Sequence, residues 1–548
     1  MSSEKEKERK MFVGVVWNCA AELKYLLTAL LFLCSIVTIL QFLPTRFSLS
    51  VSDLRPCLSS PTAPTTAIIT ATTTISLSQN TTNNNNNTTN TTTIPLSENT
   101  TNNTNNSTTT TTFTTTAAPA AAPPAPEKDQ VLENGIIKRA FNPYGLAAYN
   151  FILMSAYRGG PNTFAVMGLA SKPLHVFGKP SYQCQWVPDG AGKEENGQNQ
   201  ENFFTDGQKI LPDWGYGRVY TVLVVNCTFS APVIGSGGHG GKLLLHATTN
   251  GGGDTNFNVT DTIEALTETG EGLKNFNQLY NAKPKYDYLY CGSCLFGNLS
   301  PQRVREWLAY HIRLFGVKSH FVIHDAGGVH PEVMEVLRPW MEKGYVTLQD
   351  IREQERFDGY YHNQFLVVND CLHRYRYMAK WMFFFDVDEF LFVPKKSTLK
   401  TVMDSLSEYT QFTIEQMPMS NKLCLAEDAG KSYRKWGFEK LVYKDVKKGI
   451  RRDRKYAVQP RNVFATGVHM SQNTVGKTTH KTEGRIMYFH YHGTIAERRE
   501  PCRRSVNSTD ITVDGIPYSV DTSMRIVAGF VKRFELKMIG SVLQRTRQ

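Results

Sequence analysis

The chain has 548 residues, 41% of them hydrophobic and 20% charged, which is enough for two or three domains with separate cores. Its formal net charge of +11 favours neutral or acidic partners over basic ones. The sequence has neither a zinc-finger spacing nor an RNA-binding signature, so we expect no nucleic-acid partner.

The first predicted element is the uncharged apolar run at residues 25–44, "YLLTALLFLCSIVTILQFLP". As a helix it is about long enough to cross a bilayer. The alternative is a cleavable signal peptide, but the run is longer than the usual apolar region and no small-x-small site follows it. The preceding residues 1–24 are rich in Lys and Arg, which predicts a cytoplasmic tail and a lumenal remainder.

A stalk is predicted at residues 45–133, where Thr, Asn, Ser, Pro and Ala dominate. Such a composition buries too little apolar surface to offset the entropy of ordering, so we expect disorder. The segment contains many N-x-S/T acceptors, which suit exposure in the secretory lumen. Examples are Asn80, Asn90, Asn99 and Asn106. An anchor and a glycosylated stalk are typical of a lumenal domain held away from a membrane.

Residues 134–276 are strand-like, with β-branched or alternating runs such as "VYTVLVVNCTF" separated by Gly, Pro and Asn. This pattern predicts a β-sandwich. Ten cysteines in a lumenal chain make disulfides the default expectation, and we expect Cys184 to pair with Cys227. Exposed aromatic side chains could form a face that stacks on sugar rings, although core or turn positions are the alternative. The candidates are Trp186, Trp214 and Tyr216.

Residues 277–548 alternate between strand and helix patterns. The helix "SPQRVREWLAYHIRLFG" has Ser300 as its expected N-cap and Pro301 at its first position. Strands that alternate with helices predict a mainly parallel α/β sheet covered on both faces, with ligands at the carboxyl ends of the strands. "CGSC" (291–294) has a redox-type spacing, but no second feature supports that role.

The stretch "KWMFFFDVDEFLFVP" (380–394) places carboxylates at the end of an apolar strand. With period-two alternation, Asp386 and Asp388 point to the same side. Two like charges this close are costly unless a cation neutralises them, and Mn²⁺ or Mg²⁺ suits oxygen ligands. The alternatives are a simple turn or pairing with Arg374 and Arg376. We expect a divalent metal site here.

Several ordered motifs resemble glycosyltransferase family 92, and within it the plant β-1,4-galactan synthases. They are "YCGSCLFGNLSPQRVREWLAYHIRLFGVKSHFVIHDAGG", "NDCLHRYR", "WMFFFDVDEFLF", "ATGVHMSQN" and "YFHYHGTI". The resemblance implies a GT-A-type (Rossmann-like) α/β glycosyltransferase domain from residue 277 onward. It also implies that the preceding β-rich region is similar to a carbohydrate-binding module.

The resemblance further implies UDP-galactose as donor, a β-1,4-galactan acceptor, inversion at the anomeric carbon, and a type II location in the Golgi membrane. The sequence leaves open whether the protein forms a homodimer. The alternatives are another UDP-hexose or acceptor, or a membrane-tethered lectin without catalysis. A two-metal phosphodiesterase needs more His and Asp clusters than the sequence shows.

Within this resemblance, Asp388 is the expected direct metal ligand, with Asp386 nearer the ribose or reaching the metal through water. A histidine near the C-terminus completes the coordination in many GT-A enzymes, so His490 is favoured and His492 is the second candidate. The expected donor-binding residues are Cys291, Gly292, Ser293, Arg303, His324, Asp325, Asp386 and Lys455.

Inversion requires a carboxylate general base opposite the leaving group. Glu427 and Asp428 are candidates because they lie in a loop after an acceptor-side strand, and Glu415 is the rival. The expected acceptor-binding residues are Tyr433, Trp436 and His469.

Overall fold

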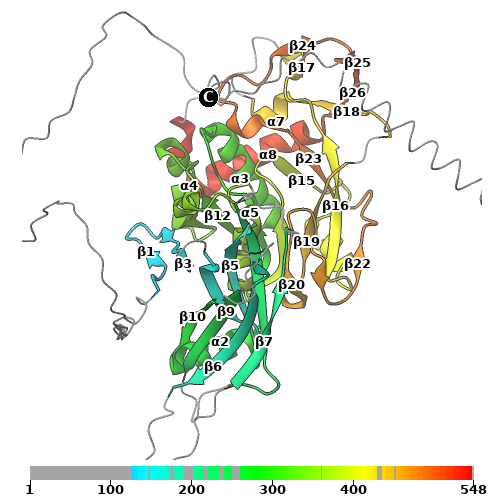
Figure 1. Cartoon of the computed structure of the whole chain (residues 1–548). Coiled ribbons are helices and arrows are strands. Elements are labelled where there is room, and N and C mark those ends of the chain that lie inside the picture. The colour runs from blue at the N-terminus through cyan, green and yellow to red at the C-terminus, as the bar shows by residue number, and fades with distance from the viewer. Residues whose placement is uncertain are drawn as a thin grey trace, which may run out of the picture. The chain divides into compact units, whose positions relative to one another are not determined.

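The computed structural model describes residues 126–545 apart from several short segments (Figure 1). The gaps are 146–148, 173–174, 176–177, 190–202, 214–218, 234–239, 250–258, 360, 429–434 and 450–451. The predicted tail and anchor, and all but the last residues of the predicted stalk, lie outside the described residues, as do Trp214, Tyr216 and Tyr433. Within the described ranges, no helix has both the length and the apolarity needed to cross a bilayer.

The β-rich region forms an eight-stranded antiparallel sheet in the order β10-β9-β6-β7-β8-β5-β4-β3. Its strands are β3 (Asn142–Tyr144), β4 (Phe151–Arg158), β5 (Thr163–Ser171), β6 (Ser181–Pro188), β7 (Phe203–Ile210), β8 (Tyr220–Thr228), β9 (Gly241–Thr249) and β10 (Val259–Glu268). Every second side chain of β4 and β5, near one end of the sheet, packs into the same buried core as side chains of β9 and β10 at the other end. The sheet must therefore fold back on itself to bring its two ends together. The predicted disulfide between Cys184 and Cys227 is confirmed and joins β6 to β8.

A second sheet has the order β1-β2-β13-β12-β11-β14-β19-β16-β23-β15, with β22 beside β16. Its strands are β1 (Gln130–Val131), β2 (Ile137–Lys138), β11 (Tyr286–Cys291), β12 (Ser319–Asp325), β13 (Val346–Asp350), β14 (Ala379–Phe384), β15 (Glu389–Phe392), β16 (Gln411–Pro418), β19 (Arg454–Val458), β22 (Thr478–Thr479) and β23 (Met487–His490). The strands from β2 to β14 are parallel, as predicted, whereas β19 runs antiparallel to both of its neighbours. The sheet is therefore mixed, and β2 joins it although its residues lie within the range 134–276 that was predicted to form only the β-rich region.

The described chain contains further helices, some of which cover the two faces of the parallel part. They are α2 (Gly270–Asn281), α3 (Pro301–Phe315), α4 (Pro331–Glu342), η4 (Arg352–Arg356), α5 (Gln364–Arg374), α6 (Leu399–Ser405), α7 (Gly437–Lys440) and α8 (Ser523–Ile539). Tyr290 and Phe383 share a core with α3, α4 and α8, while their neighbours Leu289 and Met382 pack with α5. This alternation explains the uninterrupted apolar strands. The predicted N-cap is confirmed, because the Ser300 hydroxyl accepts the Arg303 N–H.

The short elements surround the antiparallel half of the second sheet. They are β17 (Leu423–Leu425), η5 (Ala426–Asp428), β18 (Tyr443–Asp445), η7 (Pro460–Asn462), β20 (Val463–Ala465), β21 (Asn473–Thr474), η8 (Thr494–Ala496), β24 (Arg504–Val506), β25 (Asp510–Val513), β26 (Ile516–Val520) and η9 (Val542–Arg545). A disulfide between Cys424 and Cys502 links β17 to the chain before β24. Another joins Cys291 to Cys371 and so ties β11 to α5.

The two sheets meet across α5. One apolar cluster contains Met154 and Met167 from the first sheet and Phe365 and Leu366 from the helix. At the centre of the same contact lies the buried carboxylate of Asp370, which accepts hydrogen bonds from both sides of the junction. The Oδ1 atom accepts from Ser155 Oγ at 2.6 Å, Tyr157 OH at 2.8 Å and Arg139 Nη2 at 2.8 Å. The β-rich region is thus packed onto the α/β region rather than separated by a linker.

Candidate active site

The predicted metal-binding aspartates lie in a turn between β14 and β15. The apolar strand ends at Phe384, and the Glu389 N–H donates to the Asp386 carbonyl at 3.2 Å. The Glu389 carboxylate in return accepts the Asp386 N–H at 2.7 Å. The prediction that Asp386 and Asp388 continue a strand is therefore wrong, because this pair of hydrogen bonds closes a turn. Both side chains nevertheless line the same cavity.

This cavity has a volume of about 330 Å³ and opens at the carboxyl ends of β11 and β14. The strand order reverses there, since β12 and β13 lie on one side of β11 and β14 lies on the other. Open α/β sheets bind ligands at such a switch point. The polar lining residues are Ser293, Asp386, Asp388, Glu389, Gln416, Asp453, Lys455, His469, His490 and His492.

Three of these side chains could hold one metal ion. Single ligand atoms of Asp388, His490 and His492 all lie within 4.8 Å of one another. The antiparallel pairing of β15 with β23 creates this cluster, because it places His490 opposite Glu389. The second oxygen of Asp388 accepts the Gly493 N–H at 2.9 Å, and the Gln416 amide lies 2.7 Å from His490 Nδ1. Both candidate histidines thus stand beside Asp388.

Negative charge exceeds positive charge in the cavity. Lys455 Nζ lies 2.7 Å from Asp386 Oδ2 and 3.7 Å from the buried Glu389 carboxylate. Burial acts to raise the pKa of Asp386, but Lys455 outweighs it and the pKa lies below its ordinary value. For Glu389, burial prevails and raises the pKa to about 8. Asp386 and Asp388 therefore face one ammonium group, an imbalance that a divalent cation would relieve.

Of the predicted donor-binding residues, Ser293, Asp386 and Lys455 line the cavity. Cys291 does not, because its sulfur is buried in the disulfide with Cys371. Gly292 packs against the Phe385 carbonyl, where an added Cβ would lie 2.4 Å from the oxygen.

Arg303, His324 and Asp325 also lie off the cavity. Arg303 Nη1 bonds the buried Glu306 carboxylate at 2.7 Å, so the prediction that it reaches a phosphate is wrong. His324 is fully buried on the α5 side of β12, and burial lowers its pKa to about 3. Asp325 Oδ1 accepts the N–H groups of Gly327 and Val329 and so shapes the loop after β12.

The predicted general bases are wrongly placed for catalysis in this cavity. Asp428 is buried and bonds both Lys435 and Arg525, and Glu427 also faces Arg525 at 3.4 Å. Glu415 lies 3.7 Å from Arg454, while its strand neighbour Gln416 lines the cavity.

Among the lining residues that sequence reasoning missed are three with carboxylate or amide side chains, Glu389, Gln416 and Asp453. Glu389 directly follows the two aspartates, so its position in the sequence was the available signal. Asp453 lies among basic residues, a pattern typical of a solvated surface. Gln416 directly follows Glu415, which was the predicted base in that strand.

The predicted sugar-stacking residues give a mixed result. His469 lines the cavity. Trp436 is instead buried between α7 and α8, with Arg305 and Lys532 over its ring, so its predicted contact with an acceptor is wrong. Trp186 is also a core residue, fully buried with its ring centre 5.1 Å from that of Phe164.

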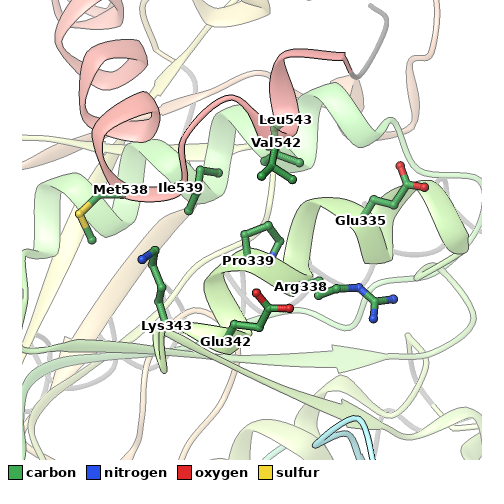
Figure 2. A pocket seen from close by; sticks show the side chains of 9 residues that line it. All are labelled: Glu335, Arg338, Pro339, Glu342, Lys343, Met538, Ile539, Val542 and Leu543. Atoms are coloured by element: carbon green, nitrogen blue, oxygen red, sulfur yellow. The ribbon is translucent and has the colours of Figure 1, made fainter.

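A larger groove of about 640 Å³ lies between α4 and the end of α8 (Figure 2). Figure 2 shows Pro339 on α4 facing Ile539 of α8, with the side chains of Glu335, Arg338 and Glu342 also along α4. It is on a helical face and away from the carboxyl ends of the strands. The described residues that line it include no histidine, so the smaller cavity is the better candidate active site.

Comparison with known proteins identifies the family of the chain. The sequence profile of glycosyltransferase family 92 matches residues 286–525, which include the whole cavity. A galactan beta-1,4-galactosyltransferase of Arabidopsis thaliana, GALS3, is 55% identical over 558 aligned residues that cover 100% of both chains. A second from the same plant, GALS1, is 53% identical over 74% of this chain and 79% of its own.

A more distant relative is the beta-1,4-galactosyltransferase galt-1 of Caenorhabditis elegans. It is 27% identical over 38% of this chain and 49% of its own. Identity above one half over the full length leaves no doubt about the relationship. The chain belongs to glycosyltransferase family 92 and is an enzyme of that family.

Proposed function

We propose that the protein transfers galactose from UDP-galactose to the non-reducing end of a β-1,4-galactan chain, with inversion and with the help of Mn²⁺. The observation that carries this proposal is the cluster of Asp388, His490 and His492 in the switch-point cavity. The full-length relatives named galactan beta-1,4-galactosyltransferases support the choice of sugar and acceptor.

The residues of the cluster fit a divalent ion. One carboxylate and two imidazoles suit Mn²⁺ better than Mg²⁺, because Mg²⁺ prefers oxygen ligands alone. When bound, the ion would offset the negative charge of the departing diphosphate. Lys455 supplies a second, permanent positive charge beside Asp386, held in place by contacts with both neighbouring carboxylates.

Asp453 is the general base in this proposal. Asp386 is engaged by Lys455, Asp388 belongs to the metal cluster, and Glu389 is buried behind the turn. Asp453 is the remaining carboxylate of the cavity wall and is exposed. It stands at the start of β19, on the antiparallel side of the cavity, with His469 nearby in the same wall. An exposed carboxylate there can take a proton from an acceptor hydroxyl.

The proposed location is the Golgi membrane, with residues 25–44 as the anchor. The disulfides of the described chain support an oxidising compartment, since three pairs involve six cysteines of the two sheets and their loops.

Gln416 is expected to hold His490 in its metal-binding orientation. Replacing Gln416 by Leu should weaken Mn²⁺ binding by about 10- to 100-fold, the usual effect of losing a partner of a ligating histidine. Gln416→Glu places a carboxylate acceptor beside Nδ1 in place of the amide nitrogen and should bind Mn²⁺ more tightly than the Leu variant. Titration calorimetry with MnCl₂ checks both. Equal Mn²⁺ affinity in wild type and Gln416→Leu would contradict this role.

The proposed reaction is tested by incubating the full-length protein with a short β-1,4-galactan primer and each of several UDP-hexoses in MnCl₂. We expect elongation with UDP-galactose, loss of product when the metal is chelated, and an α-linked donor converted to a β-linked product. Asp453→Asn should leave UDP binding intact and slow transfer by about 100-fold or more. Elongation at equal rate with UDP-glucose would contradict the proposed donor.

A further inference from the structure

The metal turn, residues 385–389, leads into a strand that lies at the edge of its sheet. Among the described strands, β15 pairs with β23 alone. On that side the Asp388 carbonyl accepts the Tyr491 N–H at 3.0 Å. Because successive residues of a strand direct their backbone groups to opposite sides, the Glu389 carbonyl and both backbone groups of Leu391 point away from β23. Buried backbone groups of this kind need partners from another part of the chain.

One face of α3 supplies these partners. Trp307 Nε1 donates to the Glu389 carbonyl at 2.9 Å, and the Tyr310 hydroxyl donates to the Leu391 carbonyl at 2.6 Å. The Leu391 N–H donates to His311 Nε2 at 3.2 Å. Residues three and four apart share one face of a helix, and all three of these side chains are buried. Side chains of α3 thus take the place of a further strand beside β15.

The contacts of His311 fix its protonation state. Its Nδ1 lies 2.8 Å from the Trp307 carbonyl, which can only accept a hydrogen bond, so this nitrogen carries the proton. The other nitrogen, Nε2, then accepts the Leu391 N–H. Burial favours the same neutral form, because it lowers the pKa of His311 to about 3. At neutral pH the ring is therefore a fixed hydrogen-bond acceptor for β15.

The other end of the metal turn is held from β11. The Tyr290 hydroxyl donates to the Phe385 carbonyl at 2.9 Å, and both side chains are buried. The Phe385 ring lies against the rings of Tyr290 and Trp307, with centroids 4.8 Å and 5.7 Å apart. Gly292 leaves room for the hydroxyl, since an added Cβ would lie 1.8 Å from it. Side chains thus bond the carbonyls at both ends of the turn, and Asp388 lies between them.

These bonds matter for the metal cluster because the cluster is assembled from two separate segments. His490 and His492 come from the end of β23 and the chain after it, whereas Asp388 comes from the metal turn. A bound metal ion requires its ligands within a few tenths of an ångström of their proper distances. The position of the turn relative to β23 therefore decides whether the three side chains can share one ion.

Four side chains, called the clamp below, direct polar atoms at the backbone of residues 385–391: Tyr290, Trp307, Tyr310 and His311. The described lining of the cavity includes none of them, so they act through the turn. We propose that the clamp positions Asp388 for metal binding and that its members are positioning residues of the transfer reaction. The inference rests on the proposed function, because it takes Asp388 to bind a divalent ion.

The test is titration calorimetry of MnCl₂ into the full-length wild-type protein and its variants, at a temperature where all of them are folded. Tyr290→Phe keeps the ring and removes only the hydroxyl that holds the Phe385 carbonyl. Losing a direct partner of a metal ligand weakens metal binding by about 10- to 100-fold, and Tyr290 acts one step further away, so we expect a loss of about 5- to 10-fold. Trp307→Phe, which frees the Glu389 carbonyl, should give a similar loss.

The same variants should show a metal-dependent defect in activity. Galactosyl transfer by Tyr290→Phe should fall at limiting MnCl₂ and recover toward the wild-type rate at saturating MnCl₂. The matched control is Tyr443→Phe, because the buried Tyr443 hydroxyl donates to the Ser508 carbonyl at 2.6 Å in a separate core away from the cavity. It loses a hydrogen bond of the same kind, so its midpoint of thermal unfolding should fall by a similar amount while its Mn²⁺ affinity equals that of wild type.

Wild-type Mn²⁺ affinity in both Tyr290→Phe and Trp307→Phe would overturn the inference and leave the proposed function standing. An equal loss of Mn²⁺ affinity in Tyr443→Phe would assign the effect to general destabilisation, which overturns the inference as well. Failure of the wild-type protein to bind Mn²⁺ would instead overturn the proposed metal, and with it the basis of the inference.

Discussion

Asp388→Ala is expected to lower the rate of galactosyl transfer by about three orders of magnitude, with the fold intact. The side chain contributes one of the three clustered ligand atoms and has few structural contacts, chiefly the Gly493 N–H. Its loss removes the carboxylate from the proposed Mn²⁺ site, while β14, β15 and β23 keep their own hydrogen bonds. Initial rates with UDP-galactose and a galactan primer give the measurement.

The matched control is Asp404→Ala, which removes an exposed carboxylate on α6, outside the cavity. Its rate should equal that of wild type. Asp388→Ala should also lose Mn²⁺ binding in calorimetry while its thermal unfolding midpoint stays close to that of wild type. Wild-type transfer by Asp388→Ala in metal-free buffer would rule out the proposed role of the cluster.

Asp370→Asn is expected to lower the free energy of unfolding by about 3–5 kcal/mol, the usual result of breaking a buried ion pair. Asp370 is fully buried on α5 and bonds Arg139 through both oxygens. Without the carboxylate charge, the Arg139 guanidinium remains buried with only Asp129 as a charged partner at 3.0 Å. Denaturant unfolding of the full-length protein, followed by tryptophan fluorescence, measures the change.

A double-mutant comparison separates this ion pair from simple packing. Arg139→Met with Asp370→Leu removes both charges, and it should destabilise the protein less than the sum of the single changes. Asp404→Asn, in an exposed pair with Lys400, should have no measurable effect. If Asp370→Asn lowers the free energy of unfolding no more than Asp404→Asn does, the contact between the two sheets at Asp370 is not important for stability.

The same carboxylate makes stability depend on pH. Burial acts to raise the pKa of Asp370, but Arg139 and Arg374 outweigh it and hold the pKa far below its ordinary value. A depressed pKa in the folded state gives stability that is present above the unfolded-state pKa of about 4 and is lost as the pH falls below it. Wild type should therefore lose stability below about pH 4 more steeply than Asp370→Asn.

The contact between the first sheet and α5 also determines the expected effect of deleting residues 134–276. If residues 134–276 were an independent carbohydrate-binding module, as the family resemblance implies, removing them would weaken polymer binding and leave the chemistry in place. In the structure this deletion would remove Arg139, Ser155 and Tyr157 from Asp370 and expose the apolar face of α5. We expect the truncated protein to unfold or aggregate, so point changes are the better probes of the first sheet.

Local signals in the sequence were sufficient for much of the fold. The alternation of strands and helices from Tyr286 to Phe384 predicted the parallel part of the second sheet, because each apolar run and the Ser300 N-cap of α3 are encoded nearby. The position of the two aspartates in the cavity at the end of the apolar strand was also predicted. Their position was predictable since a strand buried on both faces must end where charge begins.

Contacts between distant segments were not predictable in this way. Asp453 reaches the cavity only because β19 inserts antiparallel between β14 and β16, and its basic neighbours masked it. Sequence patterns left both a core and a surface position open for Trp186 and predicted an acceptor contact for Trp436, and packing against other elements buries both. The pairing of α5 with the first sheet depends on side chains more than two hundred residues apart, such as Arg139 and Asp370.

The central claim is that a single divalent ion binds between Asp388, His490 and His492 and meets the donor diphosphate there. Anomalous diffraction from crystals of the protein soaked with MnCl₂ and UDP tests it most directly. The account predicts one strong manganese peak in contact with these three side chains and with the diphosphate oxygens. Bound UDP with no manganese at this cluster, or manganese held elsewhere, would contradict it.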